Sequence, residues 1–411
     1  MIQPLNIAVV AACPFPTSQG SQVLIRESCE ALAKRGHNVH VVTYHFGEDL
    51  PCPGLTIHRI PKIFKYNKFR SGPALKKPLL DILLAIKLDE VVRKNKIDVI
   101  HCHNYEAPVA AFPVKLLRNV PVVYHSHNTM SDEFYTYFRL KIPQTIARFA
   151  ARLMDRYIPR MADYSIAINR KVAEFLFKSG ISPSTIKLIP PGIDYGDPVE
   201  VPDRDLLNKY QLQSQKLLIY AGNLDGYQRI DLILDALPDI IGEHPDSRLL
   251  FLTGSNSESL MAEIIERDLA ENISIINDLS FDEIKHILAI GCLAVNPRIA
   301  WSGFPIKLLN YFAAGLPVVA FEDAAPCVDH CHNGLLAKAG DYKEFAKCVN
   351  YLLSNPEKAR QIGRNARSTV EELYSWDRIA AEIEMIYAEL LSLERETSGF
   401  IKQPEENVLT A

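Results

Sequence analysis

Residues 302–320 read SGFPIKLLNYFAAGLPVVA and describe one complete helix-to-strand unit. Gly303 permits a close backbone turn, and Pro305 fits the first turn of a helix. Gly315 is placed to end that helix just before an apolar, β-branched run. Amides at a helix start bind anions such as a diphosphate, and Lys307 in the first turn would oppose the helix dipole unless an anion lay nearby. The stretch predicts an α/β crossover with an anion site; an ordinary crossover with ordinary caps is the alternative.

Short apolar runs alternate with helical patterns along the chain, in two successive series. Strands are predicted at residues 6–11, 39–44, 55–60, 98–102, 120–125, 165–168 and 186–189, and again at 217–221, 249–253, 273–276, 293–296 and 318–321. Continuously apolar strands indicate burial on both faces, as in a parallel sheet covered by helices. The sequence therefore predicts an α/β protein with two doubly wound, Rossmann-like domains. Two such sheets facing across a cleft would place ligands at the carboxyl ends of their strands.

The domain boundary is expected at Pro190-Pro191-Gly192, because proline removes a hydrogen-bond donor and glycine permits a sharp turn. Residues 1–192 are predicted to form the first domain and residues 193–375 the second. The helical pattern over 376–395 is expected to pack back on the first domain, and the polar tail over 396–411 is expected to be loose.

The composition is that of an ordinary globular protein. Of its 411 residues 48% are hydrophobic, and the net charge is −4. The sequence lacks both an apolar run of about 18 residues and a basic amino-terminal region, so neither a membrane span nor a signal peptide is expected. The eight cysteines form no C-x-x-C pair, which fits reduced thiols. A cytoplasmic protein is the expectation.

Positive charge is concentrated in the first half of the chain. Residues 1–195 contain 26 Lys and Arg against 15 Asp and Glu, whereas residues 196–411 contain 19 against 34. The stretch 51–80 has no acidic residue and carries Arg59, Lys62, Lys65, Lys68, Arg70, Lys76 and Lys77. An anionic partner is expected on this side. Nucleic acid is a poor candidate, because no recognition motif accompanies the charge.

A second basic feature is a helical one. Arginines recur at every fourth position from Arg148 to Arg160 and would lie along one side of a helix, with Ile146, Phe149, Leu153 and Tyr157 on another side. This pattern predicts adhesion to the anionic face of a membrane or binding of a phosphorylated, lipid-linked acceptor. A solvated charged face is the alternative.

Several short motifs occur in a fixed order around residues 302–320. They are CPFP at 13–16 with GSQ at 20–22, ALAKRGHNV at 31–39, VVYHSHN at 122–128, IPPGID at 189–194, IYAGN at 219–223, YQRID at 227–231 and NGLL at 333–336. The ordered set covers almost the whole chain and resembles the retaining glycosyltransferases of family four (glycosyl transferases group 1). This resemblance implies the GT-B architecture, with the acceptor on the first domain and a nucleotide-diphosphate sugar on the second.

The resemblance also implies a donor site in the second domain. Its expected residues are Gly222, Asn223, Asp278, Leu279, Arg298, Ser302, Gly303, Phe304, Pro305 and Asn310. The arginine and lysine that clamp the diphosphate in the family fall on Asn223 and Gln228 here. Lys307 and Arg229 are therefore expected to supply catalytic positive charge in their place, with Arg298 nearby.

The glutamate pair of the family pattern is also replaced, and its two positions are Ser302 and Asn310. Asn310 can still accept a hydrogen bond from a ribose, at a cost of roughly 1–2 kcal/mol of donor affinity. Reaction with retention in this family is thought to follow a front-face path in which the leaving diphosphate helps to deprotonate the acceptor. Such a path needs stabilisation of charge on the leaving phosphate rather than a carboxylate nucleophile.

In the first domain, His127 aligns with the family histidine that orients the sugar and is the expected catalytic residue there. The acceptor-side residues are expected to be Gly20, Ser21, His125 and His103. His125 and His127 would share a face of a strand, and His101-x-His103 repeats this spacing one strand earlier. Structural histidines with satisfied ring nitrogens are the alternative.

The expected activity is transfer of a sugar, with retention, to a glycan or lipid-linked acceptor in polysaccharide or glycolipid biosynthesis. An inactive or weakened homologue serving as a partner subunit, or a nucleotide-sugar epimerase of the same architecture, are alternatives. A nicotinamide dehydrogenase is disfavoured, because no G-x-G-x-x-G follows the first strand. No cofactor and no metal are expected: residues 327–332 hold metal-binding residue types but no second cluster at zinc-finger spacing. Cytoplasmic location, with peripheral contact to the inner membrane face, is the corresponding expectation.

Overall fold

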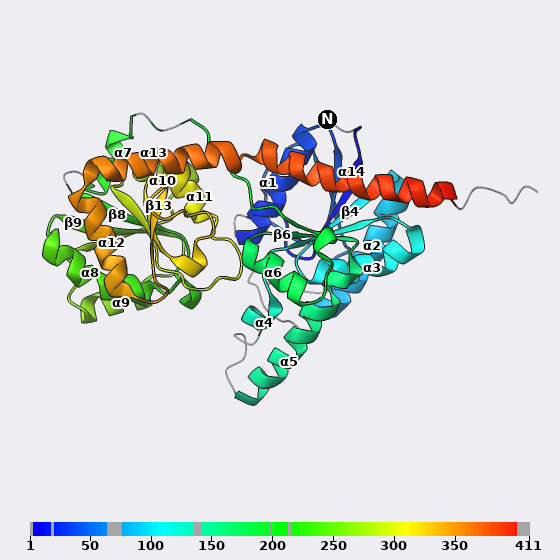
Figure 1. Ribbon diagram of the computed structural model, residues 1–411, viewed down its shortest axis with the longest axis horizontal. Helices are drawn as coiled ribbons and strands as arrows, with labels where there is room; N and C mark the ends of the chain where they lie inside the picture. Colours follow the sequence, from blue (N-terminus) through cyan, green and yellow to red (C-terminus); the bar gives the residue numbers. More distant parts are fainter. Residues whose placement is uncertain are drawn as a thin grey trace, which may run out of the picture. The chain divides into compact units, whose positions relative to one another are not determined.

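The computed structural model describes residues 3–17, 20–63, 76–134, 141–197, 199, 201–212 and 215–400. The chain divides into two compact units, one made of Met1–Gly192 with Trp376–Ala411 and the other of Ile193–Ser375. Each unit contains one parallel β-sheet with helices around it (Figure 1). Both are Rossmann-like, as the sequence predicts.

The first unit has a seven-stranded sheet in the order β3-β2-β1-β4-β5-β6-β7. Its strands are β1 (Asn6–Ala11), β2 (Asn38–Thr43), β3 (Leu55–Arg59), β4 (Val99–His103), β5 (Val122–Ser126), β6 (Tyr164–Ala167) and β7 (Ile186–Leu188). Its helices are α1 (Gly20–Lys34), α2 (Lys77–Asn95), α3 (Glu106–Arg118), α4 (Met130–Glu133), α5 (Lys141–Tyr157), α6 (Arg170–Lys178) and α14 (Trp376–Phe400), with short 3-10 turns at Pro159–Met161 and Pro183–Thr185.

The second unit has a six-stranded sheet in the order β10-β9-β8-β11-β12-β13. Its strands are β8 (Lys216–Ala221), β9 (Ser247–Thr253), β10 (Ile273–Asn277), β11 (Leu293–Asn296), β12 (Val318–Phe321) and β13 (Gly334–Ala337). Its helices are α7 (Arg204–Lys209), α8 (Ile230–Glu243), α9 (Glu258–Glu266), α10 (Phe281–Leu288), α11 (Lys307–Ala313), α12 (Tyr342–Ser354) and α13 (Pro356–Leu373), with 3-10 turns at Gly226–Gln228 and Glu322–Ala324.

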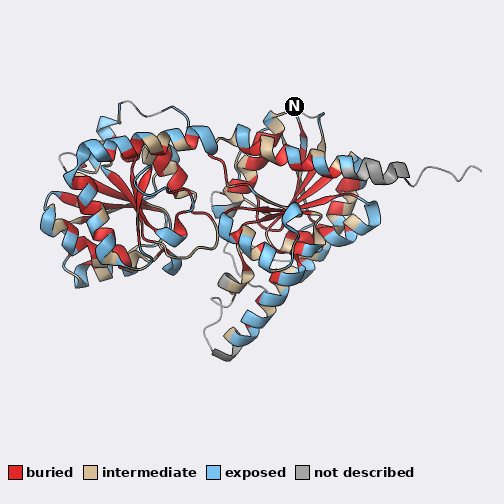
Figure 2. Cartoon of the chain, viewed as in Figure 1, coloured by how far each residue is buried: buried red, intermediate tan, exposed pale blue. Residues whose placement is uncertain are grey.

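Both faces of each sheet are buried, and Figure 2 shows the strands as the buried centre of each unit. In β1, Ile7 and Val9 face one core, which α1 and α14 complete, whereas Ala8 and Val10 face another core, which α2 and α3 complete. The alternation follows from the two-residue period of a strand. Because both cores are apolar, the strand itself is continuously apolar, which is the pattern in the sequence.

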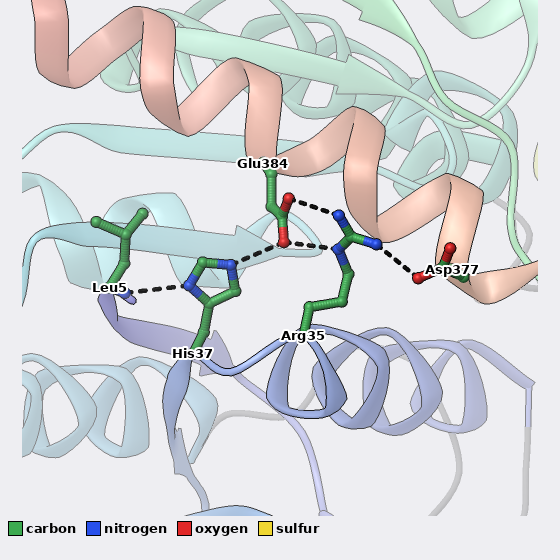
Figure 3. Close-up of polar contacts among 5 residues, drawn as sticks. All are labelled: Leu5, Arg35, His37, Asp377 and Glu384. Atoms are coloured by element: carbon green, nitrogen blue, oxygen red, sulfur yellow. Dashed lines mark hydrogen bonds and ion pairs between the residues drawn. The ribbon is translucent and has the colours of Figure 1, made fainter. Parts of the chain in front are cut away.

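The last long helix, α14, belongs to the first unit, where it packs beside α1. Arg35, just after α1, donates from Nε to Glu384 Oε1 (2.6 Å) and from a terminal nitrogen to Glu384 Oε2 (2.9 Å) (Figure 3). His37 Nε2 lies 3.0 Å from the same Glu384 oxygen, and His37 Nδ1 accepts from the backbone N–H of Leu5 (3.1 Å). The RGH sequence at 35–37 therefore fastens the carboxyl-terminal helix to the first sheet, with Gly36 at φ +96° making the turn between the two side chains.

Strand boundaries agree with the sequence prediction to within about two residues, with one omission. β13 is absent from the predicted strands, although its residues fall in the NGLL motif at 333–336. Only four residues long, it lies at the edge of the sheet, where it pairs with β12 and has an isolated bridge from Gly334 to His330. It starts with glycine directly after Asn333, and an Asn-Gly pair is the pattern of a turn rather than of a strand. The final helix extends to Phe400, five residues beyond the predicted end.

Candidate functional site

The second sheet has a topological switch point between β8 and β11. From β8 the chain adds β9 and β10 on one side of the sheet, and it then returns to β11, which pairs with the other side of β8 and is followed outward by β12 and β13. Doubly wound sheets bind their ligands at the carboxyl ends of the strands that flank such a point. Gly222 and Asn223 follow β8, and Arg298 follows β11. These three predicted donor residues therefore lie at the carboxyl ends of the two strands that flank the switch point.

Lys307, the first residue of α11, reaches back to the end of β8. Its Nζ donates to Tyr220 Oη (2.9 Å) and to Gln228 Oε1 (3.0 Å), and lies 4.0 Å from the centre of the Tyr220 ring. Both hydrogen-bond acceptors are neutral oxygens, and no salt bridge to Lys307 is found in the described part of the chain. Burial, followed by the positive charge of Arg298, lowers the pKa of Lys307 to about 7.

Gly222 keeps the backbone open beside this ammonium group. Its φ is +147°, and a Cβ atom there would lie 3.1 Å from Lys307 Nζ. Glycine therefore lets the end of β8 approach the lysine without a side chain between them. On the other side, Tyr311 Oη accepts from the Ala221 N–H (2.7 Å) and donates to the Ala221 carbonyl (3.2 Å), which joins α11 to the end of β8.

A chain of side-chain amides continues from Lys307. Gln228 accepts from Lys307 and donates from Nε2 to Asn223 Oδ1 (3.0 Å), and Asn223 Nδ2 donates to Tyr227 Oη (3.0 Å). Each amide therefore has a fixed orientation, with its oxygen toward the cation. Gln228 is buried, whereas Tyr227 is exposed. Asn223 and Gln228 hold the positions of the family's clamp residues, and here they orient the lysine rather than contribute charge.

The loop after β11 is held by Arg298. Its guanidinium donates to the carbonyls of Ala300 (2.9 Å) and Ser302 and lies over the Tyr227 ring, 5.3 Å from its centre. Gly303 has φ +84°, in agreement with the turn expected there. Arg298 therefore shapes the approach to α11 and adds positive charge beside Lys307.

Three other predicted donor residues lie on or just before α11. Phe304 and Pro305 are buried, and the Phe304 ring packs on Tyr374 with ring centres 6.2 Å apart. Their side chains therefore support the loop. Asn310 is half-buried, one helical turn after Lys307. The helix itself begins at Lys307, and its seven residues make it short.

The remaining two groups of predicted residues are placed differently. Arg229 forms a salt bridge with Asp231 (2.7 Å) and occupies the left-handed conformation before α8, at φ +55°. Asp278 and Leu279 follow β10, two strands away from β8 in the sheet order. The next residue, Ser280, caps α10 through a reciprocal hydrogen-bonded pair with Glu283.

In the first unit the structure gathers four histidines. His101 and His103 lie on β4, His125 lies on β5 and His127 follows β5, and all four are buried. The His125 and His127 rings are stacked, with centres 4.8 Å apart, and His103 Nδ1 is hydrogen-bonded to His127 Nε2 (2.9 Å). Burial lowers the pKa of His127 to about 4 and that of His101 to about 3, so these imidazoles are neutral at pH 7.

Only some of the residues predicted on the acceptor side are described in the structure. Gly20 is exposed at the start of α1, with φ +48°, whereas the side chain of Ser21 lies outside the described residues. Of the basic stretch 51–80, residues 64–75 are also outside them. Tyr220 and Tyr311 are not among the residues predicted from the sequence, and Gln228 is named there only as a position where the family's clamp charge is lost. All three lie within the sequence motifs, on β8, on α11 and in the turn Gly226–Gln228.

Residues 327–332 form a loop whose polar groups are used locally. The Leu336 N–H donates to His330 Nδ1 (3.0 Å), and the Asn333 amide accepts from the Asp329 N–H (2.7 Å) and donates to the Cys327 carbonyl (3.1 Å). These contacts fix the turn into β13. Among the described residues, no helix is long and apolar enough to cross a membrane.

Family models match both units. The model described as Glycosyltransferase Family 4 matches residues 18–196, and the model for glycosyl transferases group 1 matches residues 204–369. A related protein, the N-acetyl-alpha-D-glucosaminyl L-malate synthase of Bacillus anthracis, is 24% identical over 399 residues, with 92% of this chain and 96% of that protein covered. The D-inositol 3-phosphate glycosyltransferase of Segniliparus rotundus is 22% identical and covers 91% of this chain and 87% of its own.

Solved structures show the same fold. HepE of Anabaena, in complex with UDP and glucose, has a TM-score of 0.72 at 18% identity and covers 94% of this chain and 99% of its own. Sucrose-phosphate synthase from Thermosynechococcus elongatus has a TM-score of 0.78 at 18% identity and covers 95% of this chain and all of its own. With two Rossmann-like units and family models matching each of them, the chain belongs to the group 1 glycosyltransferases and has the GT-B architecture.

Proposed function

We propose that this chain transfers a sugar, with retention of configuration, from a nucleotide-diphosphate sugar to a glycan or lipid-linked acceptor. The observation that carries the proposal is Lys307, a half-buried ammonium group with neutral oxygen partners at the switch point of the second sheet. A cation in such a place is poised to pair with an anionic ligand, and a diphosphate is the anion that a sugar nucleotide supplies.

The proposed chemistry follows from where negative charge develops. When the bond from the sugar to the diphosphate breaks, charge accumulates on the leaving phosphate oxygen, and a positioned cation stabilises it. Lys307 supplies that cation, and Gly222 leaves room for the phosphate to approach. The acceptor hydroxyl gives its proton to the leaving phosphate, so no protein carboxylate acts as a nucleophile. In the first unit His127 is proposed to orient the sugar: its imidazole is neutral, and because Nε2 is hydrogen-bonded to His103, Nδ1 is the nitrogen that would contact a hydroxyl.

Incubation of the purified protein with a panel of UDP-, GDP- and ADP-sugars tests the proposal. We expect one of them to be hydrolysed slowly to the nucleoside diphosphate, which chromatography would detect, and the released sugar to retain its anomeric configuration by NMR. An isomeric nucleotide sugar formed without acceptor would instead identify an epimerase. Failure of UDP, GDP and ADP to bind at millimolar concentration would favour an inactive partner subunit.

Asn310 provides a further prediction about the donor site. If it occupies the position that contacts the ribose, Asn310→Glu should maintain or strengthen nucleotide binding, because a carboxylate accepts a stronger hydrogen bond from a hydroxyl than an amide does. Isothermal titration of both proteins with the preferred nucleoside diphosphate measures the difference. A loss of affinity greater than about tenfold, or roughly 1.4 kcal/mol, would remove Asn310 from the ribose position.

The first unit carries a surface suited to a lipid-linked acceptor. On α5 the apolar side chains Ile146 (65% exposed), Phe149 (64%), Leu153 (41%) and Tyr157 (54%) face outward, while Ala147 and Ala151 are buried. Arg148, Arg152 and Arg156 are exposed on the same helix, whereas Arg160, which the sequence pattern places on it, lies beyond its end in the 3-10 turn Pro159–Met161. An exposed apolar stripe flanked by arginines is typical of a helix that lies in the surface of an anionic membrane.

Replacing Arg148, Arg152 and Arg156 with glutamine should reduce co-sedimentation with vesicles containing anionic phospholipid. Each basic residue near such a surface contributes about 1 kcal/mol, so the partition coefficient should fall roughly 100-fold. The matched control replaces Arg93, Arg170 and Lys178, three exposed basic residues elsewhere in the unit, and should change it much less. Equal sedimentation of both triple variants would make α5 an ordinary solvated helix.

A further inference from the structure

Three of the buried histidines, His101, His103 and His125, lie with their rings close together. His101 and His103 are two residues apart on β4 and therefore point to the same face, and His103 is the register partner of His125 on β5. The ring centres are 4.6 Å apart for His101 and His103, 5.1 Å for His103 and His125, and 5.5 Å for His101 and His125. The three rings are stacked on the face of the sheet that α1 and α14 cover.

Only two of the six ring nitrogens of these histidines have a hydrogen bond among the described residues. His101 Nδ1 lies 2.6 Å from Tyr387 Oη on α14, and His103 Nδ1 lies 2.9 Å from His127 Nε2. In contrast, His101 Nε2, His103 Nε2 and both nitrogens of His125 are buried and have no hydrogen-bond partner in the described part of the chain. Each such atom costs about 1–3 kcal/mol when it is left unpaired. Four of them in one cluster indicate a common partner.

The three histidines also bring ring nitrogens close to one another. One ligand atom from each of His101, His103 and His125 can be chosen so that all three lie within 4.8 Å of one another. Around a tetrahedral zinc ion, ligand nitrogens 2.0–2.1 Å from the metal lie about 3.3 Å apart. The rings are stacked, so their in-plane lone pairs run nearly parallel, and the rings must rotate about the final histidine torsion, which is soft, to point all three nitrogens at one ion.

We propose that His101, His103 and His125 bind a divalent transition metal ion of the zinc class. The partners on the outer side of the cluster fit this role. Tyr387 Oη and His127 Nε2 can accept the Nδ1–H groups of His101 and His103, which leaves both Nε2 atoms available as ligands. Histidine ligands of metals are held in this way by an acceptor for the other ring nitrogen. Three ligands leave the fourth tetrahedral position for water.

This inference departs from the metal-free protein expected from the sequence. The HxH spacing on β4 supplies only two ligands. The third, His125, follows 22 residues after His103, and this spacing is no metal-site signature in the sequence. The parallel pairing of β4 with β5 is what adds His125. The diphosphate site proposed around Lys307 in the second unit does not depend on this ion.

Metal binding to the full-length, tag-free protein tests the site. After treatment with a chelator and dialysis, the protein is titrated with Zn²⁺ and with Co²⁺, and the bound metal is measured by mass spectrometry after gel filtration. We expect close to one ion per chain, a visible absorption of tetrahedral Co²⁺ and a rise in Tm with Zn²⁺. A chain that takes up no metal under these conditions overturns the proposal.

His125→Phe is the decisive variant, because His125 has no recorded hydrogen bond to lose and phenylalanine keeps a stacked ring in the same slot. Metal affinity should fall at least tenfold and the Zn²⁺-dependent rise in Tm should disappear. His58→Phe is the control: His58 pairs with His40 (3.1 Å) on neighbouring strands of the same sheet, and its loss should leave the affinity unchanged. Should the phenylalanine variant not fold, His125→Gln serves instead. Undiminished affinity in the His125 variant overturns the proposal.

Discussion

Replacement of Lys307 with alanine should weaken the binding of a nucleoside diphosphate by roughly 10- to 150-fold, equivalent to about 1.5–3 kcal/mol for a hydrogen bond to a charged group. The ammonium group lies at the end of β8, and no salt bridge neutralises it in the described part of the chain. Isothermal titration measures the effect. Lys343→Ala, which removes an exposed lysine from α12 of the same unit, is the matched control and should bind normally.

The lowered pKa of Lys307 adds a pH dependence whose sign can be stated. In the free protein the pKa is about 7, so the side chain is mostly neutral at pH 8. A bound diphosphate favours the ammonium form, and binding at pH 8 should therefore take up about 0.9 proton, with affinity falling by up to about tenfold per pH unit above 7. Titration in buffers of different ionisation enthalpy measures this proton uptake. Lys307→Arg, which stays charged, should bind without the pH dependence.

Equal affinity of wild type and Lys307→Ala would contradict this assignment. A pH profile that was the same in wild type and Lys307→Arg would contradict the role of the lysine pKa, even if both proteins bound nucleotide. These two results separate the position of the diphosphate from the protonation state of the residue that binds it.

Removal of the Glu384 carboxylate should lower the free energy of unfolding of the first unit by about 3 kcal/mol, because it leaves Arg35 without its main partner in a largely buried place. Glu384→Ala also removes the acceptor for His37. Urea unfolding followed by circular dichroism measures the change. Asp377→Ala is the control: the Asp377 side chain is 82% exposed and contacts the same arginine, so its loss should cost less than about 1 kcal/mol.

The same contact predicts a dependence of stability on pH. The hydrogen bond from Arg35 holds the pKa of Glu384 below its ordinary value of 4.5. The contact therefore stabilises the fold fully above pH 4.5, and this contribution is lost as the pH falls through the lowered pKa. Glu384→Gln should remove that part of the acid sensitivity. If Glu384→Ala and Asp377→Ala were equally stable, α14 would be held by its apolar contacts alone.

The strands and the fold class could be read from the sequence because both sheets are buried on both faces. Runs such as 6–11 are continuously apolar, and the helical windows between them have the spacing of βα units. Strand order could not be read in this way. The order β3-β2-β1-β4 depends on which strands pair, and no local pattern in the sequence encodes that choice. Edge strand β13 was missed for a different reason, because its Asn333-Gly334 start has the pattern of a turn.

The site was predictable only where a motif carried it. Lys307, Gly222 and Gly303 could be placed because helix starts and glycine turns have local signatures. The hydrogen bonds of Gln228 to Lys307 and Asn223 join segments far apart in the sequence, so only the fold reveals them. Arg229 is a predicted residue whose contacts only the structure reveals. Its phosphate-binding role stays a prediction, and its salt bridge with Asp231 is a contact that its charge alone does not indicate.

The most direct test is a crystal structure of the chain with its preferred nucleoside diphosphate bound. We expect a phosphate oxygen within hydrogen-bonding distance of Lys307 Nζ, beside the backbone of Gly222. A nucleotide whose phosphates lay elsewhere, with Lys307 still bonded only to Tyr220 and Gln228, would contradict it.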